Sequence, residues 1–191
     1  ITLDIHSDPI CPWCHIGKAR LDAAIARTGR NPFEMRWRMF RLNPEMPAGG
    51  MDRQSYLEAK FGGAEAAAEV YGRIAREARA SGLDPRFDRI ARTPQTLDAH
   101  RLIRWARAEG VETPVAEQLF RRYFERGEDI GERAVLLAVA ESAGLERAVI
   151  ERLLDGEAER AALEAEEAEA RAMGIAGVPC FVIAGRHVVQ G

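Results

Sequence analysis

Two cysteines three residues apart, Cys11 and Cys14, constrain the fold of this chain more than any other feature. They follow a short apolar stretch at residues 1–5 that predicts a β-strand, and they begin a run that predicts a helix ending near Gly29. At the helix start, free N–H groups and the positive end of the helix dipole stabilise a thiolate on the first cysteine. The second cysteine, one turn into the helix, can attack the first and resolve a mixed disulfide. The spacing therefore predicts a redox-active disulfide.

The same motif has rival interpretations. The run from Cys11 to His15 reads C-x-x-C-H, a pattern that can attach a c-type haem. A zinc site would need two further ligands, and Cys180 and His187 are the available pair. Two plain core cysteines are the remaining alternative. A redox role is favoured among these, and the far end of the chain bears on the choice.

A second informative stretch lies near that far end. Residues 174–189 predict a strand, a tight turn and another strand, with Gly177-Val178-Pro179 at the entrance. A proline that opens a strand is a place where a cis X–Pro bond occurs, so a cis bond before Pro179 is predicted. Alternation along the strand turns Cys180 away from Pro179, and Cys180 is expected to be a buried, inert thiol.

Together these features resemble the thioredoxin fold. Within that fold the chain is similar to the DsbA family, and most of all to its FrnE-type branch. The matching stretches are SDPICPWCHIG at 7–17, TLDAHRL at 96–102 and GVP at 177–179. They span the chain in the order that the family has. Haem would explain only one end of the chain, so the resemblance weighs against it.

The resemblance implies an α/β fold, thioredoxin-like with a large all-helical insertion. Residues 1–50 and 174–191 would form a discontinuous thioredoxin-like domain, and residues 51–173 the helical insertion domain that caps the dithiol. In this family a C-terminal helix usually packs on the sheet, and it is expected to lie beyond Gly191.

Periodicity along the chain agrees with this organisation. Residues 33–40 alternate apolar and charged side chains, which predicts a strand, and the Pro- and Gly-rich loop 42–50 is a candidate wall of the active-site cleft. From residue 53 onward, apolar residues recur at helical spacing. The helices predicted from this pattern are 53–61, 64–81, 94–109, 114–125, 132–143, 146–154 and 156–173. The acidic run 164–169 is expected to be a solvated helix face.

Composition excludes several classes of function. The net charge is −3 and the charges are interspersed, which leaves no basic surface for nucleic acid. No apolar run reaches the roughly 20 residues of a membrane span, and no signal peptide precedes the first strand. Three cysteines, two of them close together, do not make a framework of structural disulfides. A cytoplasmic enzyme without a bound metal or cofactor fits best, and a leader removed before Ile1 stays an open alternative.

The family resemblance implies a protein-disulfide oxidoreductase of the oxidase or isomerase type. Cys11 would exchange with a substrate sulfur to give a mixed disulfide, and Cys14 would resolve it. The expected partner is a protein or small molecule that carries a thiol or disulfide, with glutathione or another thiol as the redox partner. Without an imidazole inside the motif, a moderate rather than an extreme oxidant is expected.

Four residues are predicted to contact the substrate. Pro12 and Trp13 lie between the cysteines, and the Trp13 ring is expected to be exposed and available to partner proteins. Val178, next to a proline that the family holds in cis, would offer its backbone to an extended substrate segment. Pro179 completes this set.

Three further side chains are candidates for tuning the dithiol. Asp8 would raise a thiol pKa if it were close and charged, and could relay protons if it were buried. His15 could stabilise a thiolate or simply be solvated. His100 lies on the flank of the apolar stripe of its helix, where a histidine is most often a satisfied hydrogen-bonding residue, and its place in the family-like block 96–102 raises the chance that it faces the cysteines.

Two other classes of function stay open. A sister branch of the fold comprises glutathione-dependent 2-hydroxychromene-2-carboxylate isomerases and kappa-class glutathione transferases, which carry a serine at the Cys11 position. A non-catalytic binding module would keep the substrate groove without needing a redox-competent Cys11. Replacement of Cys11 by serine separates the binding module from a dithiol enzyme.

Overall fold

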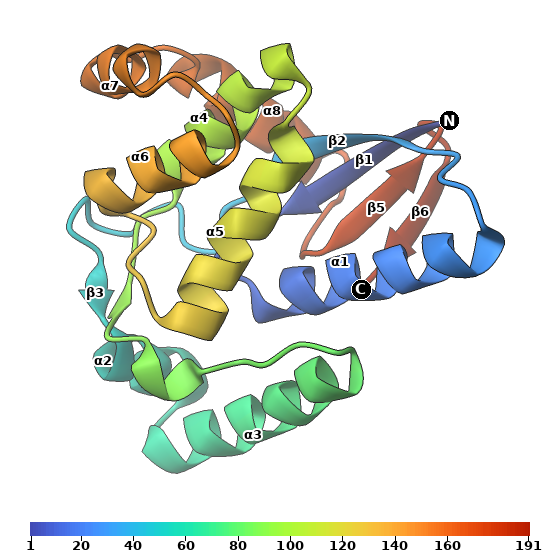
Figure 1. Ribbon diagram of the computed structural model, residues 1–191. Coiled ribbons are helices and arrows are strands. Elements are labelled where there is room, and N and C mark those ends of the chain that lie inside the picture. The colour runs from blue at the N-terminus through green and yellow to red at the C-terminus, as the bar shows by residue number, and fades with distance from the viewer.

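The computed structural model describes residues 1–191, and its centre is a four-stranded sheet in the order β2-β1-β5-β6 (Figure 1). β1 (Thr2–Ser7) pairs in parallel with β2 (Glu34–Met39). On its other side β1 pairs antiparallel with β5 (Cys180–Ile183), and β6 (His187–Gln190) follows β5 antiparallel at the edge. The strand predicted at 33–40 and the strand–turn–strand predicted at 174–189 are therefore confirmed.

Side chains alternate between the two faces of this sheet. Leu3 and Ile5 on β1 are almost fully buried, and Trp37 of β2 lies opposite Ile5 and is buried with it. Asp4 and Arg38, on the other face, are partly exposed and form an ion pair with Nε to Oδ1 at 2.6 Å. Because neighbouring residues of a strand point to opposite faces, Ser7 lies on the same buried face of β1 as Ile5.

The helix predicted after the first strand is α1 (Pro12–Thr28), and it lies along one face of the sheet (Figure 1). Cys11 is its N-cap residue and Pro12 its first residue, a position that suits proline because the missing N–H would have no partner there. Gly29 ends the helix in the left-handed conformation, with φ of 70°, which glycine adopts without the strain of a Cβ.

The segment between β2 and β5 is almost entirely helical, and each of the seven predicted helices is present. They are α2 (Arg53–Phe61), α3 (Ala64–Ala80), α4 (Leu97–Ala106), α5 (Glu112–Arg126), α6 (Arg133–Ser142), α7 (Arg147–Asp155) and α8 (Arg160–Ala172), with short 3-10 turns at Phe87–Arg89 and Arg107–Glu109. Two helices, α4 and α8, begin three or more residues later than predicted. Thr96 caps α4, so Pro94 stays outside it, and Glu159 before α8 has a left-handed backbone with φ of 65°.

A second, two-stranded sheet was not predicted from the sequence. β3 (Met51–Asp52) pairs antiparallel with β4 (Arg92–Thr93). Two residues per strand are too few to show an alternating pattern. Gly50, with φ of 67°, makes the turn into β3, and its Cα approaches the Thr93 carbonyl so closely that a Cβ would collide with it.

One main core of 24 buried residues joins the sheet to the helical segment. It contains Ile5 of β1 and both Cys11 and Cys14, together with Leu102 of α4 and Leu119 of α5. The two segments distinguished in the sequence, 1–50 with 174–191 and 51–173, thus pack around a common core.

The acidic run on α8 is not simply the solvated face that its composition predicts. Glu167 is buried, and its carboxylate accepts hydrogen bonds from the backbone N–H and Nε of Arg41. Glu166 accepts from Arg104 and Arg38. The expectation holds for the exposed Glu164 and Glu169 and fails for Glu167, because arginines from distant parts of the chain meet this helix, which its local sequence does not reveal.

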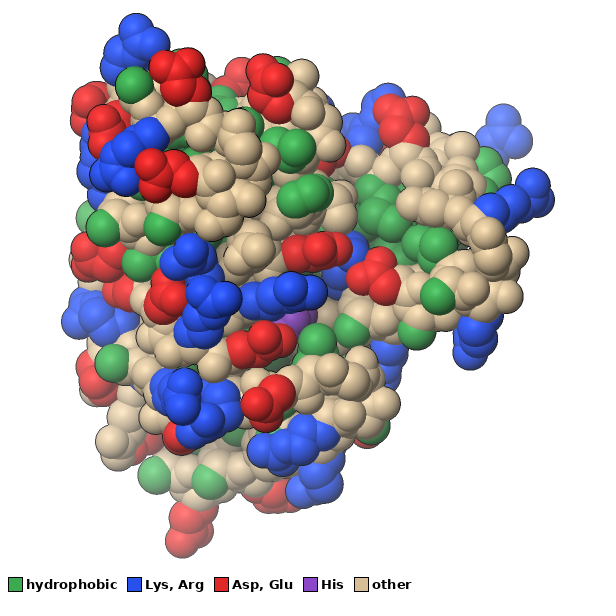
Figure 2. Space-filling view, viewed as in Figure 1, with side chains coloured by type: hydrophobic (Ala, Val, Ile, Leu, Met, Phe, Trp, Pro, Cys, Tyr) green, Lys and Arg blue, Asp and Glu red, His purple; other side chains and the backbone are tan.

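The surface carries mixed charges. Positive and negative side chains are interspersed over the face seen in Figure 2, without a large area of one sign. None of the helices combines the length and apolar character needed to cross a membrane.

Candidate active site

Cys11 lies where the end of β1 leads into α1, against the loop that precedes β5. Its backbone N–H donates to the Asp8 carbonyl at 2.9 Å. Its thiol is buried and donates to the Val178 carbonyl, with Sγ to O at 3.6 Å. The Val178–Pro179 peptide bond is cis. The two ends of the chain that carry the predicted motifs therefore meet at the Cys11 sulfur.

Cys14 lies one turn further along α1, and both sulfurs are free thiols in this structure. Cys14 is 2% exposed, and burial raises the pKa of its thiol well above the usual value, with a further increase from the neighbouring Cys11 sulfur. The Ser7 hydroxyl and the backbone at Asp8 act in the opposite direction. Cys14 thus holds its proton tightly, whereas attack on a disulfide requires the thiolate.

The two residues between the cysteines are less exposed than predicted. Pro12 is buried. Trp13 is partly buried, because its ring packs against the main core and against a smaller cluster around Ile16. Trp13 lies with Pro179 and Phe181 in the wall of an apolar groove of about 310 Å³. The expectation of a freely exposed Trp13 was therefore wrong, although its ring still borders this groove.

His15 is neither solvated nor charged. Its ring stacks on Phe120 and Phe124 of α5, with centroids 5.3 Å and 5.6 Å away. Burial lowers the pKa of His15 to about 4, and the positive charges of Arg121 and Lys18 act in the same direction. A neutral imidazole cannot stabilise a thiolate by its charge, so neither role that the sequence allowed for His15 is seen.

Asp8 and His100 are both buried and face one another. Asp8 Oδ2 accepts from the Leu42 N–H at 2.7 Å, and Oδ1 accepts from the Ile10 N–H at 3.4 Å. His100 Nε2 lies 3.7 Å from Asp8 Oδ1, which is too far for a direct hydrogen bond. The carboxylate thus anchors the loop between β1 and α1 to the chain after β2. His100 lies on the buried side of α4 rather than at its flank.

Cys180 belongs to a different part of the interior. It packs with Phe40, Ala170 and Ile175 in a cluster separate from that of Cys11, and Gln190 Nε2 donates to its sulfur at 3.6 Å. Burial raises the pKa of its thiol. No three His, Cys, Asp or Glu side chains gather in a way that could hold a metal ion, so the donors of the zinc alternative do not come together.

Sequence reasoning missed Arg53, the first residue of α2. It is buried, and no carboxylate pairs with it. Its guanidinium donates to Thr93 Oγ1 at 3.2 Å and to the Tyr123 hydroxyl at 3.4 Å, and it lies 4.9 Å from the Tyr71 ring centre. Burial raises the pKa of Tyr71, Arg53 lowers it, and the nearby Cys11 raises it slightly. A buried cation thus lies in the helical segment near the dithiol, held by partners from three other elements.

Comparison with known proteins agrees with this geometry. Residues 2–191 match the sequence profile of the DSBA-like thioredoxin domain. The chain belongs to this family. A similar solved structure is that of a probable DsbA oxidoreductase from Streptomyces coelicolor, with 31% identity and a TM-score of 0.90 over 100% of this chain and 83% of that one.

More distant structures share the fold of this DSBA-like chain. The cytosolic disulfide reductase DsbM from Pseudomonas aeruginosa, solved with GSH, has 24% identity and a TM-score of 0.69, over 100% of this chain and 90% of DsbM. A 2-hydroxychromene-2-carboxylate isomerase has 14% identity and a TM-score of 0.73, over 100% and 89% of the two chains. The family supports thiol oxidoreductase chemistry.

Proposed function

We propose that this protein is a thiol–disulfide oxidoreductase that works through a Cys11–Cys14 disulfide. One observation carries the proposal: Cys11 is the N-cap residue of α1, and its thiol faces the Val178 carbonyl beside the cis peptide bond to Pro179. Backbone N–H groups at a helix start favour negative charge on that sulfur. Cys14, buried directly behind it, is placed to resolve a mixed disulfide.

The reaction balances with the two cysteines alone. In the reducing direction the Cys11 thiolate attacks a substrate disulfide, the substrate S–S bond breaks, and the departing sulfur takes up a proton. Cys14 then loses its proton and attacks Cys11 Sγ, so that the Cys11–Cys14 bond forms and the second substrate thiol leaves. Two electrons and two protons pass to the substrate. Oxidation of a substrate dithiol follows the same steps in reverse, and we infer the oxidase or isomerase direction from the family resemblance.

The substrate would meet the protein at the loop before β5. The Val178 backbone makes no hydrogen bond to other backbone groups and can pair with an extended peptide, while Pro179 and the partly exposed Trp13 flank it. A protein or small molecule with a thiol or disulfide, glutathione included, fits this requirement. DsbM, which was solved with GSH and is named cytosolic, supports both glutathione as the redox partner and the expected cytoplasmic location.

The isomerase of the sister branch is the alternative. This chain shares the fold of that isomerase. In the sister branch, however, the family resemblance implies a serine at the position of Cys11. No residue of the site favours that chemistry over thiol exchange.

The test is an equilibrium titration against glutathione, with the thiols alkylated and counted by mass. Wild type and Cys180→Ser are expected to show the same reversible two-electron couple, and Cys11→Ser none. A potential of about −200 mV or higher would support oxidase or isomerase work, and one near about −270 mV reductase work. Absence of any couple in the wild type would overturn the proposal.

A further inference from the structure

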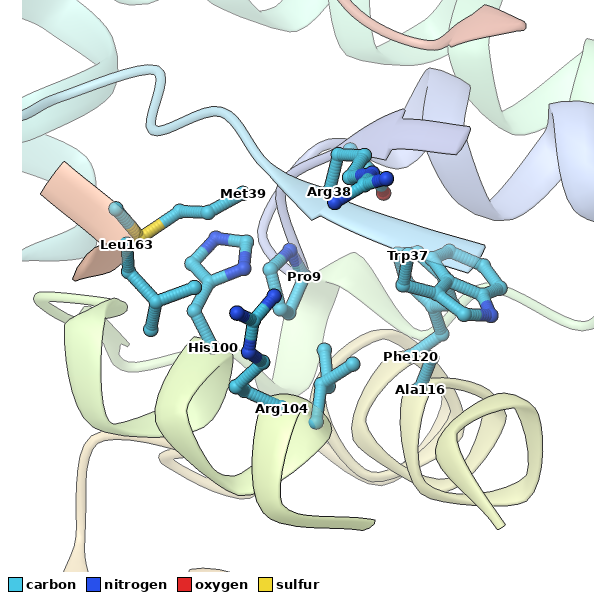
Figure 3. Close-up of a pocket in the computed structure, with 11 residues that line it drawn as sticks. Pro9, Trp37, Arg38, Met39, His100, Arg104, Ala116, Phe120 and Leu163 are labelled. Carbon is cyan, nitrogen blue, oxygen red and sulfur yellow. The ribbon is translucent and has the colours of Figure 1, made fainter. Parts of the chain in front are cut away.

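A small cavity lies between the end of the central strands and the helical segment (Figure 3). Its volume is about 10 Å³, which is close to the space that one water molecule occupies. Most of its wall is apolar. The polar side chains in that wall belong to Ser7 of β1, Arg38 of β2, and His100 and Arg104 of α4.

Two buried polar atoms in this wall have no hydrogen-bond partner in the protein: Ser7 Oγ and His100 Nε2. A buried donor or acceptor without a partner costs about 1–3 kcal/mol, so native structures satisfy such atoms with protein groups or ordered water. Asp8 lies beside this wall, and its Oδ1 is 3.7 Å from His100 Nε2, too far for a direct hydrogen bond. Ser7, His100 and Asp8 thus provide the polar partners that a single buried water requires.

The cavity is connected to the dithiol through Ser7. The Ser7 hydroxyl lies close enough to the Cys14 thiol to lower its pKa, although without the geometry of a full hydrogen bond. Cys14 is the thiol that must lose a proton in the resolving step, and it is 2% exposed. Bulk water does not reach it freely, so its proton needs a route through the protein.

We propose that one water molecule held between Ser7 and His100 carries the proton of Cys14 to the His100 imidazole. The inference rests on the proposed function. As Cys14 attacks the mixed disulfide, its proton passes through the Ser7 hydroxyl and the water to His100 Nε2. The Cys14 electron pair forms the bond to Cys11 Sγ, and the substrate sulfur leaves with the electrons of the broken bond. In the reverse direction the same route returns the proton to the leaving Cys14 thiolate. His100 is a positioning and proton-accepting residue that acts through the water.

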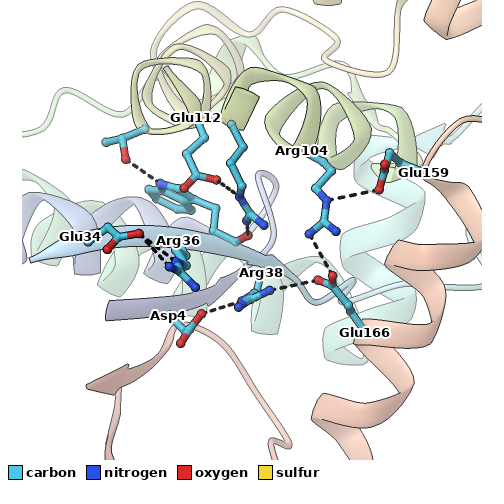
Figure 4. Close-up of polar contacts among 11 residues, drawn as sticks. Asp4, Glu34, Arg36, Arg38, Arg104, Glu112, Glu159 and Glu166 are labelled. Atoms are coloured by element: carbon cyan, nitrogen blue, oxygen red, sulfur yellow. Dashed lines mark hydrogen bonds and ion pairs between the residues drawn. The ribbon is translucent and has the colours of Figure 1, made fainter. Parts of the chain in front are cut away.

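The charged groups around His100 suit a transient imidazolium. The Asp8 carboxylate faces Nε2, with Oδ1 3.7 Å away, and places a negative charge on that side of the ring. Arg38 and Arg104 line the outer side of the cavity, and Glu166 joins them, with Oε1 at 2.9 Å from Arg104 Nη1 and Oε2 at 3.4 Å from Arg38 Nη1 (Figure 4). These three side chains are about a quarter exposed, so the proton can pass from the cavity to solvent beside them.

A symmetric nitrobenzoate disulfide with a coloured thiolate separates the two chemical steps. Attack by Cys11 on this reagent releases the first coloured thiolate, and attack by Cys14 on the resulting mixed disulfide releases the second. Stopped-flow absorbance of the reduced protein therefore gives one phase for each cysteine. A missing first phase would mean that the proposed function has failed, whereas the proton route is read from the second phase alone.

Ser7→Ala and His100→Leu are expected to slow the second phase about 100-fold at neutral pH, the lower end of general-base effects, and to leave the first phase unchanged. The slowing should shrink as the pH rises, because hydroxide can then remove the Cys14 proton directly. The solvent isotope effect on the second phase should also differ from the wild-type value in both variants. The matched control is His6→Leu. His6 is also a buried histidine with an unpartnered ring nitrogen, and it follows Ile5 on β1 but points to the opposite face.

The expected result is a slow second phase in Ser7→Ala and His100→Leu, with wild-type kinetics in His6→Leu. A second phase in Ser7→Ala that is as fast as in the wild type would overturn the proton route, because that substitution removes a single oxygen and leaves the fold intact. Equal slowing in His6→Leu would overturn it as well. A crystal structure of the wild type at high resolution should show the water between Ser7 Oγ and His100 Nε2.

Discussion

The imidazole of His15 lies flat against Phe120, with ring centroids 5.3 Å apart and the two planes inclined by 7°. The nearest carboxylate oxygen, Oε1 of Glu125, is 3.8 Å from Nε2 and does not hold the ring in its charged form. Burial lowers the pKa of His15 to about 4, so the ring is neutral at pH 7. His15 fills space beside the dithiol and brings no positive charge to it.

This burial predicts that stability depends on pH in a defined window. The unfolded imidazole takes up a proton near pH 6.5 and the folded one only near pH 4, so the free energy of unfolding falls as the pH drops through this range. The loss from this group approaches about 3 kcal/mol, since each pKa unit is worth about 1.4 kcal/mol. His15→Phe should flatten this part of the pH profile in urea denaturation. His187→Phe, at the exposed sheet edge, should keep the wild-type slope, and an unchanged slope in His15→Phe would contradict this account.

Replacement of the buried Glu167 carboxylate is expected to destabilise the protein strongly, unlike replacement of an exposed carboxylate on the same helix. Burial raises its pKa, but hydrogen bonds from Arg41 and Arg171 outweigh burial and lower it overall. Glu167→Gln should reduce the free energy of unfolding by about 3 kcal/mol at pH 7, because Arg41 loses its buried partner. The difference from wild type should begin to shrink as the pH falls below about 4.5, where the unfolded carboxyl takes up a proton, and should vanish only below the lowered pKa of the folded carboxyl. Glu164→Gln is the control: this residue lies 3.6 Å from Arg41 and is half-exposed, and its loss should cost less than about 1 kcal/mol.

A side chain added at Gly17 is expected to push on the loop beside Cys11. A Cβ at this position would lie 3.0 Å from Pro179 Cγ and 3.3 Å from Phe181 Cζ, so Gly17→Ala must displace the loop that contacts the Cys11 thiol. We expect the reaction of Cys11 with a small disulfide to slow by about tenfold, because small displacements of reacting groups are costly. Gly72→Ala in α3 meets only the end of the Arg76 side chain at 3.8 Å, and it should raise stability by about 1 kcal/mol without any effect on the rate. Equal rates in the two variants would show that the loop tolerates the shift.

Much of the fold could be predicted from local pattern and resemblance. The bounds of α2 are those predicted, since Asp52 caps it and Gly62 ends it in the left-handed conformation. α1 and the strand pair at the C-terminal end also follow their motifs. By contrast, β3 and β4 are two residues each and lie far apart in the sequence, so neither carries a periodic signal that predicts their pairing.

The candidate site divides in the same way. Cys11, Cys14 and Pro179 could be predicted because a motif marks each of them. The burial of His15 could not, because Phe120 and Phe124 come from a helix far along the chain. His100 was found only through a family-like block. Ser7 was within the quoted motif, but its importance depends on a cavity that only the packed structure reveals.

The central claim is that Cys11 is the sulfur that exchanges with substrate, and it can be tested most directly when the resolving step is blocked. Reduced Cys14→Ser protein is incubated with glutathione disulfide, and the adducts are located by intact mass and peptide mapping. We predict one glutathione per chain, on Cys11, and no adduct at that motif in Cys11→Ser. An adduct on Cys180 instead, or no adduct at all on folded Cys14→Ser protein, would contradict the account.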